Sequence, residues 1–442
     1  MGSGSVGNGA VGKAVVVGLG ATGQAVARQL VAEGWQVLIV EDRGDERTPE
    51  AVHRLGANLG TATDAAGADL VVPSPGVPPG HPVYDVASAA GVPVLSEVEL
   101  AWRAAAGKPL VAVTGTNGKT TVTTLVAAML VESGRTAVAA GNIGLPLIEA
   151  VRRDVDVVVA EVSSFQLQYT ESFRPSVAVW LNLAEDHLDW HRSMEHYAAA
   201  KRRIWANQGG GDVAVVNADD EAVSEAAVTA SGRVVSFGLE EGDYSLDGDV
   251  LVGPGGRQII PRAHLRRSRP HDVANALAAT AAAEAVGVSL GACRAALSTF
   301  DGLPHRLQLV LDSGGVRYYD DSKATTPASV LAALRSFETV VLIAGGRNKG
   351  LDLGVLRQEA HRLRAVIAIG EAASAVQSAF AGAAPVTRAG SMGAAVAAAR
   401  AAARPGDAVV LSPGCASFDW YSSYVERGED FVQAVRDLEA LA

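Results

Sequence analysis

Residues 110–125, LVAVTGTNGKTTVTTL, have the composition of a phosphate-binding loop between a strand and a helix. Gly115 and Gly118 allow the backbone to curl so that successive N–H groups point at one spot, and the following helix adds its positive N-terminal end. In such a loop Lys119 reaches the terminal phosphates and the hydroxyl of Thr120 reaches a magnesium ion. We therefore predict a phosphate site here.

The loop departs from the common phosphate-loop pattern at one position. That pattern has a glycine five residues before the Gly-Lys pair, where this chain has Val113. A plain glycine turn with an exposed lysine is the alternative. The order of strand, glycines, Gly-Lys-Thr and helix favours the phosphate site.

Two later strands are expected to end beside this loop. One apolar run ends at Glu161, and the strand that starts at Val177 ends shortly before His187. Because ligands of an open parallel sheet lie beyond the carboxyl ends of its strands, Glu161, His187 and the loop should share one crevice. A carboxylate in that place suits Mg²⁺, which prefers oxygen ligands. Each residue alone could be an ordinary exposed side chain, but their convergence with the loop favours a functional site.

The segment HYAAAKRRIWAN, residues 196–207, predicts a helix with a lysine on its apolar stripe. Tyr197, Lys201, Ile204 and Trp205 fall at positions i, i+4, i+7 and i+8. An inward lysine is costly unless it is paired or neutralised. Its stem could instead run along the surface with the ammonium group in water, and the pattern alone leaves both possibilities open.

A complete G-x-G-x-x-G lies upstream, at Gly18, Gly20 and Gly23. Glu41 and Asp42 follow the next expected strand, where a dinucleotide-binding fold places its ribose-binding acid. On these residues alone, an NAD-dependent enzyme is a hypothesis.

Three segments near the C-terminus combine Ser, Thr, Lys and Gly after expected strands. They are DDSKATTPAS (320–329), AGGRNKG (344–350) and LSPGCASFDWYSSY (411–424). Each alone suits a capped turn. Three of them in one domain favour a small anionic ligand held by hydroxyls, an ammonium group and backbone N–H groups.

Composition limits the class of protein. The 442 residues exceed one ordinary core of ~250 to 300 residues, so two or three domains are expected. The 37 basic and 48 acidic residues give a net charge of −11 without a Lys/Arg-dense run, which argues against a nucleic-acid partner. Two cysteines, Cys293 and Cys415, suit a reducing compartment. A loose polar tail at residues 1–10 and the lack of a run of ~20 apolar residues predict a cytoplasmic protein without a membrane segment.

Short apolar runs that alternate with helical stretches predict three α/β domains with doubly wound, mostly parallel sheets. The first boundary is expected near LSEVELAWRAAAGKP, where a helical stretch leads into Lys108-Pro109 and a new strand, and the second near Gly302 and Pro304. The expected domains are 1–98, 99–302 and 303–442. The segment LQLVLDSGGVRYYDD predicts a hairpin at the start of the third domain. Further strands are expected at 36–40, 69–72, 155–161, 177–182, 212–216, 365–369 and 407–411, and helices at 273–286 and 393–403.

Taken in order, these motifs resemble those of the Mur ligases of peptidoglycan synthesis, and within that family those of the D-glutamate-adding branch. The resemblance runs from about Ala14 to the C-terminus. Other branches typically carry an Asp-Tyr-Ala-His type segment where this chain has DSKATT. The most specific pieces are TGTNGKTT, GNIGLP, EVSSFQL, AEDHLDWH, YAAAKRRI, ANALAA, GLPHR, DDSKATT and LSPGCASFD.

The resemblance implies a Rossmann-like N-terminal domain, a central P-loop-type ATPase domain and a Rossmann-like C-terminal domain. It also implies a shortened phosphate loop that begins at Thr114-Gly115. The ATP site would comprise Gly115, Thr116, Asn117, Gly118, Lys119, Thr120 and Thr121, with Asn275 and Arg306 at adenine and ribose and Asp321 and Lys323 from the third domain.

Two Mg²⁺ ions are implied by the same resemblance. Thr120 and Glu161 would bind one, and His187 and Lys201 would support the other. The family's lysine at the latter position is carbamylated, and that carboxylate would explain a lysine on an apolar stripe. Lys119, Glu161, His187 and Lys201 would then be the catalytic residues.

For the substrates, the resemblance replaces NAD with a UDP-sugar. The UDP-sugar would be bound by Ala21, Thr22, Glu41, Arg43, Asn142 and His187. D-Glutamate would be bound by Thr325, Lys349, Ser417 and Tyr424. Two positions depart from the family: Tyr424 stands where most members have phenylalanine, and Glu-Asp-Arg stands where relatives often have Asp-Thr-Arg.

The implied activity is ATP-dependent amide ligation. ATP would phosphorylate the carboxylate of UDP-N-acetylmuramoyl-L-alanine, and the amine of D-glutamate would attack the acyl phosphate. A cytoplasmic monomer that closes about residues 98 and 302 is expected. Two alternatives remain open: an alanine-adding or folate-polyglutamating ligase of this superfamily, and a protein that senses NAD and hydrolyses ATP without ligation.

Overall fold

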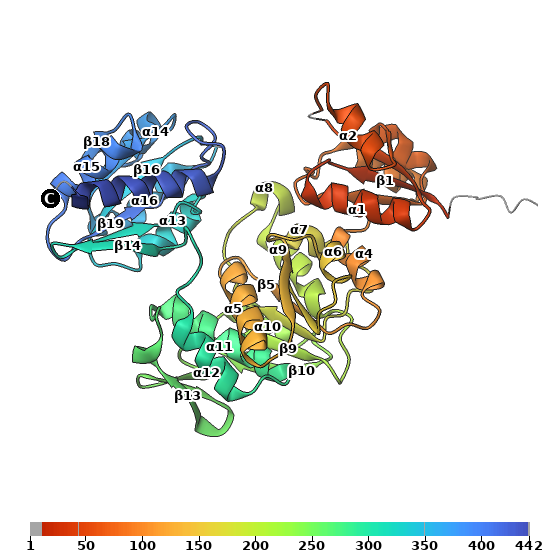
Figure 1. Ribbon diagram of the computed structural model, residues 1–442, viewed down its shortest axis with the longest axis horizontal. Helices are drawn as coiled ribbons and strands as arrows, with labels where there is room; N and C mark the ends of the chain where they lie inside the picture. The colour runs from red at the N-terminus through yellow and green to blue at the C-terminus, as the bar shows by residue number, and fades with distance from the viewer. Residues whose placement is uncertain (1–10, 43, 349, 441–442) are drawn as a thin grey trace, which may run out of the picture. The chain divides into compact units, whose positions relative to one another are not determined.

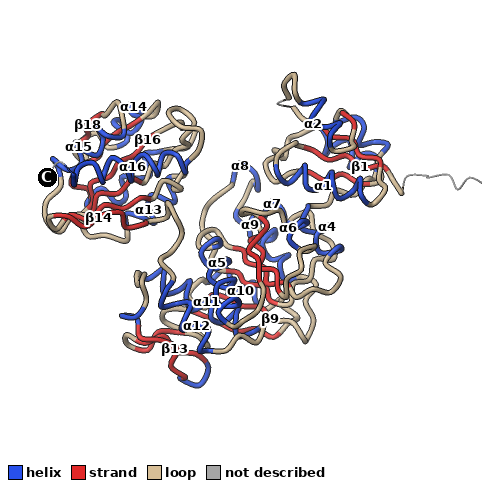
Figure 2. The backbone as a smooth tube through the Cα atoms, in the orientation of Figure 1, coloured by secondary structure: helices blue, strands red, loops and turns tan. Residues whose placement is uncertain are grey.

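The computed structural model describes residues 11–42, 44–348 and 350–440. The chain divides into two compact units, Met1–Phe300 and Asp301–Ala442. Strands and helices alternate along both units (Figures 1 and 2). The expected tail at residues 1–10, Arg43 and Lys349 lie outside the described residues.

The N-terminal part of the first unit is built on a four-stranded parallel sheet in the order β3-β2-β1-β4. The central strands β1 and β2 are almost wholly buried, which explains their continuous apolar sequences. The strands are β1 (Lys13–Val17), β2 (Gln36–Val40), β3 (Asn58–Leu59) and β4 (Leu70–Pro73), and the helices are α1 (Ala21–Ala32), α2 (Thr48–Arg54), α3 (Pro82–Ala90) and α4 (Glu97–Ala104).

The G-x-G-x-x-G segment forms the turn from β1 into α1. Gly18 has a φ of +93°, in the left-handed region that favours glycine. A Cβ atom on Gly23 would lie 1.9 Å from the carbonyl oxygen of Gly18, so only glycine lets α1 approach β1 this closely. Gly20 differs, because its φ is −67° and no atom lies within 4 Å of the position of an added Cβ. The space above Gly20 is therefore open to a ligand.

A six-stranded parallel sheet forms the middle of the chain, in the order β10-β9-β8-β5-β7-β6. The strand order reverses at β5, which has β7 on one side and β8 on the other. Ligands of doubly wound sheets bind at such a reversal, beyond the carboxyl ends of the strands. The strands are β5 (Leu110–Thr114), β6 (Ala137–Gly141), β7 (Val157–Glu161), β8 (Val177–Trp180), β9 (Val213–Asn217) and β10 (Arg233–Phe237).

Helices bury both faces of this sheet. Val111 and Val113 of β5 belong to a core with α5, α11 and α12, and Ala112 belongs to the core on the opposite face with Trp180 and Trp205. A small antiparallel sheet, β11-β12-β13, adjoins the first of these cores (Figure 1). The helices are α5 (Lys119–Glu132), α6 (Leu147–Ala150), α7 (Ser164–Leu167), α8 (Leu188–His191), α9 (Met194–Arg202), α10 (Glu221–Ala227), α11 (Pro270–Ala285) and α12 (Leu290–Thr299), and the added strands are β11 (Ser245–Asp247), β12 (Val250–Gly253) and β13 (Arg257–Pro261).

The second unit contains a six-stranded sheet in the order β14-β15-β19-β16-β17-β18. The strands β14 and β15 form the expected antiparallel hairpin, and the other pairs are parallel. The strands are β14 (Gln308–Ser313), β15 (Val316–Asp320), β16 (Val340–Gly345), β17 (Leu363–Ile369), β18 (Val386–Arg388) and β19 (Ala408–Leu411), and the helices are α13 (Pro327–Leu334), α14 (Ala373–Ala379), α15 (Met392–Ala402) and α16 (Tyr424–Ala440).

The predicted strands and the helices at 273–286 and 393–403 are confirmed within a few residues. The stretch after β16 is a 3₁₀ segment, Leu353–Arg362, with non-helical φ and ψ angles at Glu359. The carboxylate of Glu359 pairs with Arg335 at 2.8 Å and with Arg362 at 2.9 Å, and these tertiary contacts accompany the break. No helix within the described residues is long and apolar enough to cross a bilayer.

We expect Gly23→Ala to destabilise the protein by about 1 to 3 kcal/mol, because the added methyl group overlaps the carbonyl of Gly18. The matched variant Gly20→Ala adds the same group in open space at the N-cap of α1, where alanine is less favourable than glycine, and should cost only about 0.5 kcal/mol. Thermal unfolding of both variants measures the difference. Equal effects at the two positions would contradict this account of the turn.

Candidate active site

The predicted phosphate loop connects β5 to α5 at the reversal of the central sheet. Val113 is fully buried within β5, which ends at Thr114, so it belongs to the strand and does not start a glycine loop. Gly115 and Gly118 have φ angles of +154° and +84°. A Cβ atom on Gly118 would lie 2.5 Å from Oδ1 of Asn275. The loop therefore depends on glycine, and Asn275 of α11 lies directly against it.

Asn182, just beyond β8, holds the loop in shape. Its Oδ1 accepts hydrogen bonds from the backbone N–H groups of Thr116 at 3.0 Å and Asn117 at 2.8 Å. Its Nδ2 donates to the carbonyl oxygen of Asn117 at 3.2 Å. Sequence analysis missed this residue. The only signal was its place after a strand that borders β5.

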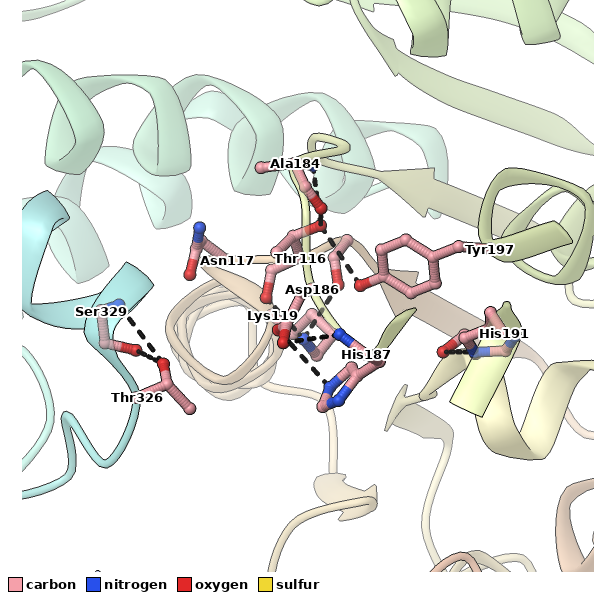
Figure 3. Close-up of polar contacts among 12 residues, drawn as sticks. Thr116, Asn117, Lys119, Ala184, Asp186, His187, His191, Tyr197, Thr326 and Ser329 are labelled. Atoms are coloured by element: carbon pink, nitrogen blue, oxygen red, sulfur yellow. Dashed lines mark hydrogen bonds and ion pairs between the residues drawn. The ribbon is translucent and has the colours of Figure 1, made fainter. Parts of the chain in front are cut away.

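Lys119 lies at the first position of α5, and its ammonium group folds over the loop. The Nζ atom donates to the carbonyl oxygens of Gly115 and Thr116, both at 2.9 Å. Figure 3 shows Lys119 close to Asp186 and His187. Thr120 and Thr121 follow in the first turn of α5. The expected phosphate-binding residues therefore surround one short turn.

Glu161 ends β7, directly beside β5. Its side chain is buried, and its Oε1 accepts a hydrogen bond from Nδ2 of Asn142 at 3.0 Å. The other oxygen, Oε2, is buried without a hydrogen-bond partner within the described chain. A buried carboxylate oxygen is costly unless a donor or a cation satisfies it. This oxygen fits a metal ligand.

Lys201 lies on the inward face of α9. Its side chain is only 1% exposed, and its Nζ donates to the carbonyl oxygen of Gly115 at 2.7 Å. Burial lowers the pKa of Lys201 well below its ordinary value, and the charge of Lys119 lowers it further. The charges of Asp186 and Glu161 oppose this lowering of the pKa but do not outweigh it. The predicted stripe is therefore confirmed, and a surface-running lysine stem is wrong, because α9 packs this face against the loop.

His187 follows β8 at the edge of this site. Its φ of +55° is left-handed, and its Nε2 lies 3.4 Å from a carboxylate oxygen of Asp186. The imidazole packs on Phe165 of α7 with ring centroids 4.7 Å apart. Between α9 and the phosphate loop, the hydroxyls of Tyr197 and Thr116 lie 3.3 Å apart (Figure 3). Asp186 and Phe165 are further residues of the site that sequence analysis missed.

A small pocket lies beside the loop, between α5 and α11. Leu125, Ala276 and Phe300 supply apolar walls, and Thr121 and Asn275 supply polar groups. Arg267 and Asp272 also line this pocket, and at about 20 Å³ it is too small for a nucleotide base, so it only marks the place beside the loop where Thr121 and Asn275 lie together. Both polar residues were predicted for the nucleotide site.

In the second unit, Asp320 ends β15 and Asp321 follows it directly. Burial raises the pKa of Asp321 to about 7, although its Oδ2 accepts a hydrogen bond from the hydroxyl of Ser412 at 2.8 Å. Burial also raises the pKa of Asp320, whose Oδ2 lies 2.7 Å from Nδ1 of His305. Arg306 lies in the turn before β14, between two residues of positive φ, His305 and Leu307. The fold therefore holds Asp320, Asp321 and Arg306 in place.

Because β15, β19 and β16 are adjacent and parallel in that order, the loops that follow them leave the same edge of the sheet. The Nζ atom of Lys323 lies 5.1 Å from the ring centroid of Tyr424. Ser417 is buried, and Thr325 is half-buried. The structure therefore brings Lys323 to Tyr424 at this edge, whereas Lys349 lies outside the described residues.

In the N-terminal sheet, Glu41 reaches the glycine loop. Its Oε2 accepts a hydrogen bond from the N–H of Leu19 at 2.6 Å. Ala21 and Thr22 begin α1 on the same loop. Three of the residues predicted for the UDP-sugar therefore lie around one turn, and the fourth in this domain, Arg43, lies outside the described residues.

Family models match three consecutive parts of the chain. They are the MurD-like N-terminal domain of Mur ligases over residues 12–96, the Mur ligase middle domain over residues 113–283 and the glutamate ligase domain of Mur ligases over residues 305–415. The protein belongs to the Mur ligase family and is an ATP-dependent ligase.

Relatives of known name are similar over nearly the whole chain. The UDP-N-acetylmuramoylalanine–D-glutamate ligase of Frankia casuarinae is 44% identical, with 96% of this chain and 94% of the relative covered. The ligase of the same name from Thermobifida fusca is 42% identical, with coverage of 96% and 98%.

Solved structures share the fold. MurF from Acinetobacter baumannii has a TM-score of 0.61 at 20% identity, with 95% of this chain and 90% of that chain covered. The UDP-N-acetylmuramate-alanine ligase of Thermotoga maritima has a TM-score of 0.60 at 21% identity, with coverage of 96% and 99%. These similarities confirm the predicted α/β fold class.

We expect Asn182→Ala to lower kcat/KM for ATP about tenfold to a hundredfold, because the N–H groups of Thr116 and Asn117 lose their common acceptor. Asn207→Ala is the matched control, since Asn207 donates to two backbone carbonyls remote from the loop. It should leave kcat/KM within about twofold. Steady-state kinetics decide, and a similar loss in both variants would contradict a role for Asn182 in shaping the loop.

Proposed function

We propose that this ligase adds D-glutamate to UDP-N-acetylmuramoyl-L-alanine in cytoplasmic peptidoglycan precursor synthesis, as a monomer. The similarity to D-glutamate ligases over 96% of the chain carries the proposal. The shaped phosphate loop, the buried Glu161 and the buried Lys201 support it.

The reaction proceeds in two steps. The γ-phosphoryl group of ATP is transferred to the carboxylate of the L-alanine unit, which gives an acyl phosphate and ADP. The amine of D-glutamate then attacks the acyl carbon, a C–N bond forms, and phosphate leaves as the amine loses a proton. Positioning and charge neutralisation supply most of the catalysis in such transfers. Lys119 and the backbone N–H groups of residues 115–118 hold the phosphates.

Magnesium fits the donors at this site. Thr120 and Glu161 would hold one ion, since Oε2 of Glu161 is buried without a partner within the described chain. His187 and Lys201, the latter as a carbamate, would support a second ion. The neutral amine is the form that reacts with CO₂, and burial lowers the pKa of Lys201 toward that form. The ions would neutralise charge on the transferred phosphoryl group.

The substrates occupy different domains in this proposal. Domain boundaries at 1–98, 99–302 and 303–442 assign the UDP-sugar to the first domain and D-glutamate to the third. Domain closure about residues 98 and 302 would then bring the ligands to the phosphate loop. The remaining contacts follow the family resemblance: Ala21, Thr22, Glu41, Arg43, Asn142 and His187 for the UDP-sugar, Thr325, Lys349, Ser417 and Tyr424 for D-glutamate, and Asn275, Arg306, Asp321 and Lys323 for the nucleotide.

A phosphate-release assay tests the function. We expect ATP-dependent release to require UDP-N-acetylmuramoyl-L-alanine and D-glutamate together, because the acyl phosphate breaks down productively only when the amine attacks. L-Alanine in place of D-glutamate is the control for an alanine-adding ligase. Equal release without any amino acid would refute ligation.

Lys201→Ala should abolish ligase activity, with partial recovery on addition of short carboxylates that replace the carbamate. Arg202→Ala, the adjacent and exposed residue of the same helix, is the matched control and should retain activity. Initial rates with and without acetate or formate provide the measurement. Activity like that of the unsubstituted protein in Lys201→Ala would remove this residue from the site.

A further inference from the structure

Helix α4 carries two buried carboxylates that the proposed reaction does not use. Glu97 is 1% exposed and Glu99 is fully buried. The helix starts after Ser96, whose side chain caps it, and it packs against α6 and α7 of the central domain (Figure 1). Burying a carboxylate is costly, so each should have a structural or functional reason.

Glu97 binds the start of α6. Its Oε1 accepts a hydrogen bond from the N–H of Ile148 at 2.7 Å. The loop 142–146 immediately precedes α6, and Asn142 at its other end donates through its backbone N–H to the carbonyl oxygen of Glu161 at 2.9 Å and through Nδ2 to Oε1 of Glu161 at 3.0 Å. The loop is therefore held at one end by Glu161 and at the other by Glu97.

Glu99 serves as an internal comparison. Its carboxylate accepts hydrogen bonds from the backbone N–H groups of Glu171, Ser172 and Phe173, from the Ser172 hydroxyl and from Arg103. Burial raises the pKa of Glu99, but the donors from Ser172, Glu171 and Arg103 outweigh burial and hold it below its ordinary value. Glu99 is thus a saturated anchor for a segment remote from Asn142.

We propose that Glu97 is a positioning residue whose carboxylate fixes the start of α6 and thereby holds Asn142 against Glu161 in the geometry that binds the UDP-sugar. The proposal rests on the proposed function for the identity of that substrate. The hydrogen bond of Ile148 and the double contact between Asn142 and Glu161 carry it. The short loop 142–146 joins Asn142 to the start of α6, so a shift of α6 must move this loop and Asn142 with it.

The ionisation of Glu97 should modulate this effect. Burial raises the pKa of Glu97 to about 7, against the hydrogen bonds from Ile148 and Leu147, and the charge of Glu149 on α6 adds to the rise. Glu149 itself pairs with Arg28 of α1 at 2.7 Å. On α4 the other charged groups are Glu99 and Arg103, which pair with each other, and α7 carries none.

A rise in pH should affect global stability and the hydrogen bond between Glu97 and Ile148 in opposite directions. Because the folded pKa lies above the unfolded one, the stability that Glu97 contributes is present at low pH and is lost as pH rises to about 7. The ionised carboxylate nevertheless accepts a stronger hydrogen bond from Ile148. Raising the pH should therefore tighten the Asn142 loop while it reduces global stability.

The test compares Glu97→Gln with the unsubstituted protein from pH 6 to pH 8. Glutamine keeps the shape and the acceptor oxygen but cannot ionise. We expect the KM of Glu97→Gln for UDP-N-acetylmuramoyl-L-alanine, divided by that of the unsubstituted protein, to be near one at pH 6 and about three to five at pH 8. The two kcat values should agree within about twofold. The melting temperature of Glu97→Gln at pH 8 should equal or exceed that of the unsubstituted protein, because a buried charge has been removed.

Glu99→Gln is the matched control on the same helix. It should lower the melting temperature at both pH values, because its amide group opposes three backbone N–H groups, and its KM ratio should not change with pH. If Glu97→Gln shows a pH-independent KM ratio, or loses stability at pH 8 as Glu99→Gln does, Glu97 is a structural residue only and the proposal is overturned.

Hydrogen exchange separates this proposal from the proposed function. In the free protein at pH 8, amides of residues 142–148 should exchange about threefold to fivefold faster in Glu97→Gln, and those of residues 171–173 should be unchanged. An unsubstituted protein that is inactive on both substrates would refute the proposed function while the exchange rates still test Glu97. Equal exchange over residues 142–148 would overturn the role of Glu97 even in an active ligase.

Discussion

The position of β5 between β7 and β8 determines the central site. All three strands are parallel, so their carboxyl ends meet at one edge, at the point where the strand order reverses. The phosphate loop, Glu161 and Asn182 follow from these three strands. The N-terminal sheet repeats the arrangement with β1 between β2 and β4, which brings Glu41 to the glycine loop.

Two buried polar groups lie at this edge of the sheet. Lys201 and Glu161 are both removed from water, and both depend on the loop or its neighbours for hydrogen bonds. Such groups lower stability unless a partner satisfies them, so the site is arranged for ligands that the chain itself does not supply. The large apolar cores on both faces of the sheet provide the stability that allows this.

Much of the fold and part of the site could be predicted from sequence. Continuous apolar runs located the strands, because strands of a parallel sheet are buried on both faces. Helical spacing placed Lys201 with Tyr197, because those positions share one face of α9. The 3₁₀ segment after β16 was not predictable, since its break coincides with ion pairs of Glu359 to Arg335 and Arg362.

The sequence by itself determined the loop chemistry, the strand order along the chain and the family, because these depend on residue types at short spacing. Only the tertiary structure decided that Lys201 is enclosed rather than exposed at its tip, that Asn182 shapes the loop, and that Glu97 reaches α6. Asn182 and Glu97 act on backbone N–H groups that are 66 and 51 residues away from them in the chain. Contacts of that kind arise from packing and leave no pattern at short spacing.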